Sequence, residues 1–218
     1  MENCYVKATF WKENGTIYRN KTKIIFNKIN EKEETLSCIG IVLMLNPGSC
    51  LPKEGEDVIK EGIPLTYLCE IDNTQRKVAI CINEAYKDCH TLEGYVYIVN
   101  ISEKREPNSK EFYKNFHEED YKNREREILE EVKMEIEKQE NQIKWIWVAF
   151  GKDKKTAKLR EKILNQLKTT PLIKSILVGI DEMVNCMHPS SPWFYRNKNG
   201  QTPKEIIINE IESKLQNS

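Results

Sequence analysis

Two asparagines and one histidine stand out in this sequence, because each comes directly or soon after a run of apolar residues. Asn46, Asn100 and His188 are far apart along the chain. A carboxamide offers both a donor and an acceptor, and a neutral imidazole donates from one ring nitrogen and accepts at the other. Such groups position water or stabilise developing charge when they converge on one cavity. The first question is therefore whether the fold brings them together.

Four apolar segments are the elements that could position these residues. Each is short and suited to a strand buried on both faces, and they cover residues 39–45, 95–99, 145–150 and 175–178. Amphipathic helical patterns lie between them, at residues 73–89, 118–142 and 156–168. The alternation predicts an α/β fold of three layers (α/β/α) around a central, mainly parallel four-stranded sheet. Ligands of such sheets bind at the carboxyl ends of the strands.

The two ends of the chain carry further local signals. Residues 4–28 alternate like a β-hairpin around an Asn-Gly turn. The sequence T-P-K-E, which starts at Thr202, is a capping box with proline at the first helical position, and it predicts a last helix. We expect a single domain over residues 1–218, with an N-terminal hairpin at 4–28 and a catalytic core at 38–218.

Composition and charge exclude several classes of protein. The chain has 39% hydrophobic and 31% charged residues, with 34 basic and 34 acidic side chains, which is typical of a globular protein. It has no signal peptide and no apolar run long enough for a transmembrane helix, so we expect a cytoplasmic protein that does not bind membranes. The 7 cysteines include no C-x-x-C pair, and no other cluster has ligand spacing. We expect neither a metal nor a cofactor.

Four short motifs resemble those of the uracil-DNA glycosylase superfamily, in the same order. M-L-N-P-G at residues 44–48 is similar to the G-I-N-P-G motif of its mismatch-specific branch. V-Y-I-V-N at 96–100 is similar to its L-L-L-N strand, and V-A-F-G at 148–151 to its L-L-W-G segment. H-P-S-S-P at 188–192 is similar to its final H-P-S-P motif.

A second resemblance covers more of the chain. Y-R at residues 18–19, L-N-P at 45–47, D-N-T at 72–74 and the late H-P are similar to a bacterial family of unknown function with L-N-P-S and H-P motifs. That family resembles a branch of the same fold. This similarity supports the architecture and leaves the substrate open.

The resemblance to the superfamily implies a monofunctional DNA glycosylase, an enzyme that flips a nucleotide out of DNA and hydrolyses its N-glycosidic bond. This cleavage creates an oxocarbenium-like sugar and an anionic base. His188 would donate a hydrogen bond to the departing base, and Asn46 would orient the attacking water. Asn100 would read the edge of the flipped base, although a strand-capping amide is the alternative interpretation.

The resemblance also bears on the substrate. Gly48 stands where uracil-specific members carry a tyrosine that blocks 5-substituted pyrimidines, so the similarity implies room for a modified or damaged base. A bulky 5-modified cytosine of phage DNA is one such substrate, which would make the protein an antiviral defence enzyme. We expect Tyr67 to stack on the flipped base and Ser49 to bind the nucleotide.

Residues near the last motif are the expected DNA contacts. Trp193 and Phe194 lie where the family inserts a wedge into the duplex, and the alternative is that they anchor the last helix in the core. The other expected contacts to DNA are Ser190, Ser191, Arg196, Lys152 and Lys154. They belong in part to a lysine-rich stretch, residues 144–174, which predicts a basic face. We expect DNA as the partner of a monomeric protein.

Three other functions fit the same residues. The fold could serve as a non-catalytic module that binds nucleic acid or a nucleotide, since fold does not fix function. It could instead be a repair glycosylase for uracil or mismatched thymine. Hydrolysis of free nucleosides or nucleotides is the third.

Overall fold

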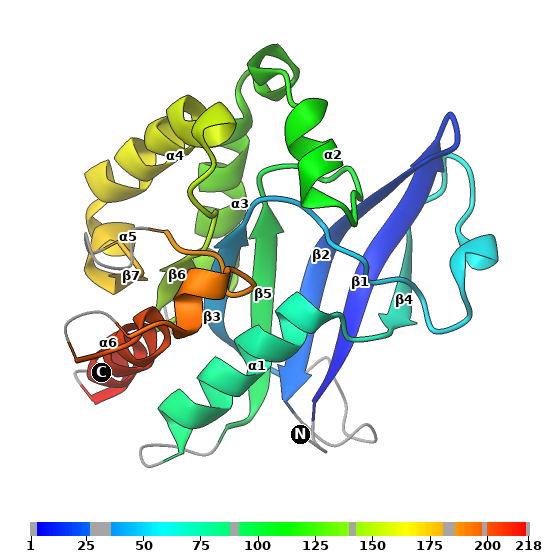
Figure 1. Cartoon of the computed structure of the whole chain (residues 1–218). Coiled ribbons are helices and arrows are strands. Elements are labelled where there is room, and N and C mark those ends of the chain that lie inside the picture. The colour runs from blue at the N-terminus through cyan, green and yellow to red at the C-terminus, as the bar shows by residue number, and fades with distance from the viewer. Residues whose placement is uncertain are drawn as a thin grey trace.

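The computed structural model describes residues 4–26, 36–87, 92–139, 143–180, 186–197 and 200–216, and these form an α/β fold with one seven-stranded mixed sheet (Figure 1). The strand order is β4-β1-β2-β5-β3-β6-β7. The strands are β1 (Cys4–Glu13), β2 (Thr16–Phe26), β3 (Cys38–Met44), β4 (Leu65–Cys69), β5 (Gly94–Asn100), β6 (Ile146–Val148) and β7 (Leu177–Val178).

The predicted sheet of four mainly parallel strands is wrong in its extent. The four expected strands, β5, β3, β6 and β7, do pair in parallel. However, the N-terminal hairpin is not an appendage, because β2 pairs antiparallel with β5 and extends the sheet. The consecutive residues Ile24, Ile25 and Phe26 are all buried, as expected for a strand that is covered on both faces. Strand β4 then adds an edge next to β1.

Helices cover both faces of this sheet (Figure 1). They are α1 (Asn73–Tyr86), α2 (Ser109–Lys114), α3 (Arg124–Lys138), α4 (Ala157–Thr169), α5 (Pro171–Ile176) and α6 (Pro203–Gln216). Residues of α1 and α6 share one buried apolar cluster with the sheet, and residues of α2, α3, α4 and α5 share the other. In the described ranges no helix has the length and apolarity needed to cross a bilayer.

Several element boundaries differ from those the sequence predicts. The helix expected at 118–142 is divided, because Asn123 has a left-handed backbone (φ 76°) between the 3-10 helix η3 (Glu118–Tyr121) and α3. The strand expected at 175–178 is shorter, because α5 begins at Pro171 and runs through Ile176. The last helix begins as expected, with reciprocal hydrogen bonds between Thr202 and Glu205. Residues 27–28 and 88–89 of the predicted elements lie outside the described ranges.

Candidate functional site

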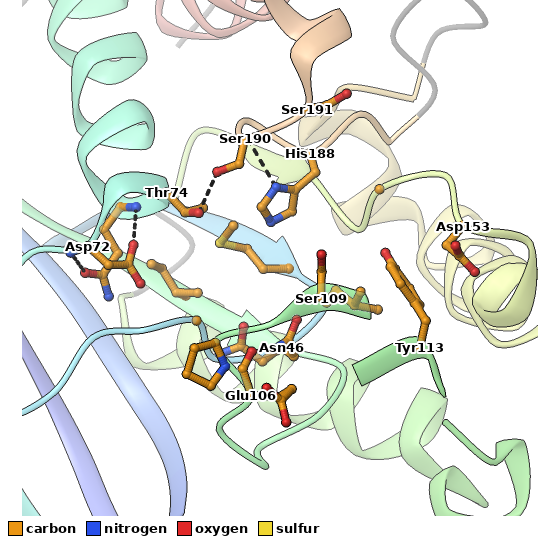
Figure 2. Close-up of a pocket in the computed structure, with 18 of the residues that line it drawn as sticks. Asn46, Asp72, Thr74, Glu106, Ser109, Tyr113, Asp153, His188, Ser190 and Ser191 are labelled. Carbon is orange, nitrogen blue, oxygen red and sulfur yellow. Dashed lines mark hydrogen bonds between the residues drawn. The ribbon is translucent and has the colours of Figure 1, made fainter. Parts of the chain in front are cut away.

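A cavity of about 480 Å³ opens at the carboxyl ends of β3 and β5, and Asn46, Asn100 and His188 all line it (Figure 2). Met44 pairs with Asn100 in the parallel register of these two strands. Both strands therefore end at the same edge of the sheet, and Asn46 follows just beyond it. The loop that carries His188 lies on the opposite side of the pocket from Asn46 (Figure 2). The three residues singled out from the sequence thus share one cavity.

Asn46 is held by its amide nitrogen. Its Nδ2 donates to the backbone carbonyl oxygens of Glu106, at 2.8 Å, and Pro47, at 3.1 Å. These two hydrogen bonds, one of them to Pro47 in the turn that follows β3, fix the position of the side chain. Because both contacts consume donor capacity, the Oδ1 atom keeps its acceptor capacity. Asn46 can accept a hydrogen bond from a water molecule or a ligand, and it is positioned before either arrives.

Asn100 is the last residue of β5 and is 5% exposed. Its backbone carbonyl accepts a hydrogen bond of 2.6 Å from the Arg124 guanidinium, which fixes the end of the strand. Its side-chain Oδ1 is buried and has no hydrogen-bond partner. A buried polar atom without a partner costs free energy, and at the wall of a cavity it is ready to pair with a ligand. Among the described residues, the Asn100 side-chain oxygen caps no strand, and it is available to a ligand.

His188 is neutral at physiological pH, with a defined tautomer. Burial lowers the pKa of His188 from 6.5 to about 4, although the nearby Asp72 carboxylate opposes the shift. The backbone N–H of Ser190 donates to Nδ1 at 3.2 Å, so the ring proton lies on Nε2. Figure 2 shows the imidazole projecting from its loop towards the pocket. The site therefore contains a neutral imidazole with a free N–H donor.

Backbone geometry at the end of β6 holds the His188 loop in place. Gly151 has a left-handed backbone (φ 85°), and its N–H donates to the carbonyl oxygen of Cys186 at 2.7 Å. A second tie joins this loop to α1, where the hydroxyls of Ser190 and Thr74 are 2.6 Å apart (Figure 2). Left-handed backbone favours glycine, so the sequence after β6 has a structural reason for its Gly.

The start of α1 forms another wall. Asp72 caps the helix, with Oδ1 accepting the N–H of Gln75 at 2.8 Å while the Gln75 side chain accepts the N–H of Asp72 at 2.9 Å. The Asp72 carboxylate also lies against Gly48, where an added Cβ would be 3.0 Å from Oδ2. The space next to Gly48 is therefore bounded by an acceptor, the carboxylate of Asp72.

Two of the expected site residues lie elsewhere. Tyr67 is on β4, where its hydroxyl donates to the carbonyl oxygen of Val58 at 2.8 Å and its ring meets Phe10 edge to face. It does not line the pocket, so a stacking role for Tyr67 is wrong. Phe194 is fully buried and stacks on Trp147, with ring centroids 5.9 Å apart. It belongs to the core beside α6 and cannot be a wedge.

Of the other residues expected to contact DNA or the nucleotide, three line the pocket and four lie outside its lining. Ser190, Ser191 and Lys152 line it, whereas Ser49, Lys154, Trp193 and Arg196 are exposed residues outside its lining. The Trp193 side chain is 54% exposed, and the Arg196 guanidinium lies 4.2 Å from the centre of its ring. Lys152 and Lys154 precede α4 and are also exposed.

The basic face predicted for residues 144–174 is partly neutralised. Lys158 and Lys162 both pair with Glu118, at 3.4 Å and 2.8 Å. Arg160 donates to the backbone carbonyl oxygens of Gly151 and Asp153 and so serves the loop after β6. A composition count cannot reveal this pairing, because Glu118 lies outside the lysine-rich stretch. Of the cations in this stretch, Lys152 lines the pocket and Lys154 is exposed two residues further along.

Sequence reasoning missed the role of several lining residues. The most important is Arg19 of β2, which is 3% exposed and lines the pocket. The alternation of the strand is a sequence signal that could have indicated this. Arg19 is two residues after the apolar Ile17 and therefore lies on the same face of β2, which is buried. Other lining residues without a predicted role are Asp72, Thr74, Gln75, Glu106, Ser109, Tyr113 and Asp153. Within the described ranges, His, Cys, Asp and Glu side chains form no group of three that could hold a metal ion.

The fold and site thus define a three-layer α/β protein with a polar pocket at the carboxyl edge of its sheet. The chain matches no protein-family model, no curated protein and no solved structure.

Proposed function

We propose that this protein is a DNA glycosylase, which takes a flipped nucleotide into the pocket and hydrolyses the N-glycosidic bond of a modified or damaged pyrimidine. The proposal rests above all on one observation. Asn46, Asn100 and His188 come from three distant segments and line the same cavity. The first offers an acceptor, the second a buried oxygen without a partner, and the third an N–H donor.

The chemistry follows from these polar atoms. Asn46 Oδ1 accepts a hydrogen bond from a water molecule and orients it towards the sugar carbon, where the new C–O bond forms. The N-glycosidic bond breaks, and its electron pair leaves with the base as an anion. His188 Nε2–H donates to a base carbonyl oxygen and stabilises that charge. The attacking water releases one of its two protons to solvent, because an amide is too weak a base to take it, and the departing base anion takes up a proton from solvent.

A neutral histidine suits this role. The ring donates from Nε2 in either protonation state, but a protonated ring would repel the Ser190 N–H that holds it at Nδ1. The low pKa of His188, about 4, keeps the ring neutral and its orientation fixed at physiological pH. Catalysis then comes from a preorganised dipole and not from proton transfer by His188.

The wall beside Gly48 bears on which base is excised. A side chain at this position would meet the Asp72 carboxylate, so a substituent of the base on this side would lie next to a hydrogen-bond acceptor. Groups that donate, such as a hydroxymethyl or sugar hydroxyl on C5 of cytosine, fit that neighbour better than a methyl group. Such bases occur in modified phage DNA, and excision would make the enzyme an antiviral defence protein.

The DNA duplex would be held at the mouth of the pocket. Trp193 offers an exposed ring that can fill the gap left by the flipped nucleotide, and Arg196 lies over that ring. The nearby lysines Lys152 and Lys154, together with the hydroxyls of Ser190 and Ser191, can contact phosphates.

The direct test is to incubate the protein with genomic DNAs that contain uracil, 5-methylcytosine, 5-hydroxymethylcytosine or glycosylated 5-hydroxymethylcytosine, and to measure the mass of each released base. We expect release of a 5-modified cytosine, and loss of release in His188→Ala. His117→Ala is the matched control, because His117 is exposed and lies outside the pocket. Release of uracil alone would reject the modified-base substrate. Tight DNA binding with no released base would favour the non-catalytic module.

A further inference from the structure

Arg19 is a buried arginine without a carboxylate partner. Its side chain lines the pocket, and the residue is only 3% exposed. Among the described residues it forms no ion pair, and its guanidinium makes one long hydrogen bond, from Nη1 to the carbonyl oxygen of Cys50 at 3.5 Å. Its Nε is buried with no partner at all. Buried charges are normally paired, because a bare cation in a protein interior is costly.

The acidic residues around the pocket form no ion pair with Arg19 in the described ranges, and each accepts hydrogen bonds from local backbone instead. Asp72 accepts the backbone N–H groups of Gln75 and Cys50, at 2.8 Å and 3.4 Å. Glu106 accepts the N–H of Asn108 at 2.9 Å, and Asp153 accepts that of Lys155 at 2.8 Å. No ion pair joins any of these carboxylates to Arg19 in the described part of the chain.

A second cation lies close to Arg19. Arg105 donates from Nε to the same Cys50 carbonyl oxygen, at 3.2 Å, and from Nη2 to Ser49, at 2.9 Å. Burial lowers the pKa of Arg105, and the neighbouring charge of Arg19 lowers it further, against the opposing effect of Glu56. Two guanidinium groups that share one carbonyl oxygen give this end of the pocket a positive potential.

Further donors lie on the same side of the pocket. Gln75 is 2% exposed, and its side-chain oxygen accepts the N–H of Asp72. Its Nε2 is buried and has no hydrogen-bond partner among the described residues. Thr74 and Gln75 also belong to the first turn of α1, where the helix dipole favours anions. Apart from the Asp72 carboxylate, which accepts backbone N–H groups, the groups described here are unpaired donors and positive charge. An acceptor-only, negatively charged group would satisfy them.

We propose that the pocket binds its nucleotide with an anionic group, a phosphate or a carboxylate, held against the Arg19 guanidinium. This inference rests on the proposed function only in taking the ligand to be a nucleotide. The guanidinium fork can pair with two oxygens of either anion. The bound anion would then neutralise the buried charge of Arg19.

Calorimetric titration with three ligands tests the proposal: the nucleoside deoxyuridine, the nucleotide deoxyuridine 5′-monophosphate and a deoxycytidine nucleoside with a carboxylate at C5 of the base. The titrations are run at pH 6 and low salt, because the hydrogen bond from Cys69 lowers the pKa of the Cys50 thiol to about 7, with Arg19 contributing. At a pH below this pKa most of the thiol is protonated, which limits its competition as an anion. We expect an anionic ligand to bind at least about tenfold more tightly than deoxyuridine.

The three arms identify the source of the anion. Preference for the monophosphate assigns Arg19 to a phosphate of the sugar, and preference for the carboxylate assigns it to an anion carried by the base. We expect Arg19→Met to abolish the preference and Arg19→Lys to keep part of it. Arg126→Met is the matched control, because Arg126 is an exposed residue of α3 that pairs with Glu130. Equal affinity for all three ligands, no binding of any, or an unchanged preference in Arg19→Met overturns the proposal.

Thermal unfolding separates a ligand-binding role from a structural one. We expect the free Arg19→Met protein to unfold at the same or a higher temperature than the wild type, because an unpaired buried charge is removed. A fall in Tm of more than about 4 °C would make Arg19 a structural residue and reject the proposal. The base-release assay is independent of both measurements. Anion binding without base release would reject the glycosylase and leave the Arg19 site intact.

Discussion

The central feature at the residue scale is that the side chains of Asn46 and His188 are each fixed through one atom and free at another. Asn46 is tied by Nδ2 and His188 by Nδ1, which leaves Oδ1 and Nε2–H for a ligand. Asn100 is buried, with its side-chain oxygen unpaired. Dipoles that are oriented in advance need no reorganisation when charge develops, and this preorganisation is the basis of electrostatic catalysis.

The pKa of His188 predicts how stability depends on pH. The folded pKa is about 4 and the unfolded value is near 6.5, so between these values the unfolded state binds a proton that the folded state does not. The free energy of unfolding is therefore highest above pH 6.5 and falls as the pH drops to 4, by roughly 3 kcal/mol at most. Urea unfolding at pH 7, 5.5 and 4 measures this. The variant His188→Gln should lose that part of the slope, and His117→Gln should keep it. Equal slopes in His188→Gln and the wild type would contradict the shift.

At the scale of elements, the strongly patterned segments were predictable. The runs that became β3 and β5 are buried on both faces, and the stripes of α1 and α4 repeat with helical spacing. The short edge strand β4 was missed, because Leu65 and Thr66 are exposed and give no periodic signal. That the hairpin joins the sheet could not be predicted, since it depends on the pairing of β2 with β5 and not on a local pattern.

The candidate site also contains residues that could be predicted from the sequence and residues that could not. Asn46, Asn100 and His188 follow strands, and the rule for the carboxyl ends of parallel strands predicts their edge of the sheet. Arg19 reaches the same pocket from an antiparallel strand, whose place beside β5 was not predicted. Phe194 and Trp193 are adjacent in sequence and have similar chemistry, yet only the packing of the 3-10 helix η5 (Pro192–Tyr195) decides which of them is buried.

Trp193 and Phe194 should differ in their contributions to stability and to DNA binding. Phe194→Ala removes a fully buried ring from the core between Trp147 and α6, so it should lower the free energy of unfolding by about 3 to 5 kcal/mol. Trp193→Ala removes a side chain that is 54% exposed and should change stability by less than about 1 kcal/mol while weakening DNA binding. Denaturant unfolding and DNA titration measure both. A Trp193→Ala protein that binds DNA like the wild type would exclude Trp193 as the wedge.

At the scale of the whole molecule, basic and acidic side chains are equal in number, but only some of the basic side chains are free of ion pairs and able to contact DNA. The chain has 34 basic and 34 acidic side chains, and Glu118 occupies two of the lysines of α4. Among the cations expected to contact DNA, Lys152, Lys154 and Arg196 are exposed and form no ion pair with another described residue. Electrostatic attraction to DNA should therefore come from a small number of contacts and not from a broad basic face.

This distribution predicts a modest salt dependence. If three cations contact phosphates, the logarithm of the DNA-binding constant should fall with the logarithm of salt concentration with a slope of about −3. Lys152→Ala and Lys154→Ala should each reduce the slope by about 1, whereas Lys162→Ala should leave it unchanged because Lys162 is paired with Glu118. Fluorescence anisotropy at several salt concentrations measures the slope. A flat response would argue against DNA as the partner.

The central claim is that Asn46, Asn100 and His188 act together on one flipped nucleotide. The most direct test is single-turnover base release from a duplex oligonucleotide. The oligonucleotide contains the base that the assay on genomic DNAs identifies as the substrate. We expect Asn46→Ala and His188→Ala each to lower the rate by about 10²- to 10³-fold, and Asn100→Ala to weaken discrimination between bases, in variants whose Tm stays close to that of the wild type. Wild-type rates in well-folded Asn46→Ala and His188→Ala proteins would contradict the account.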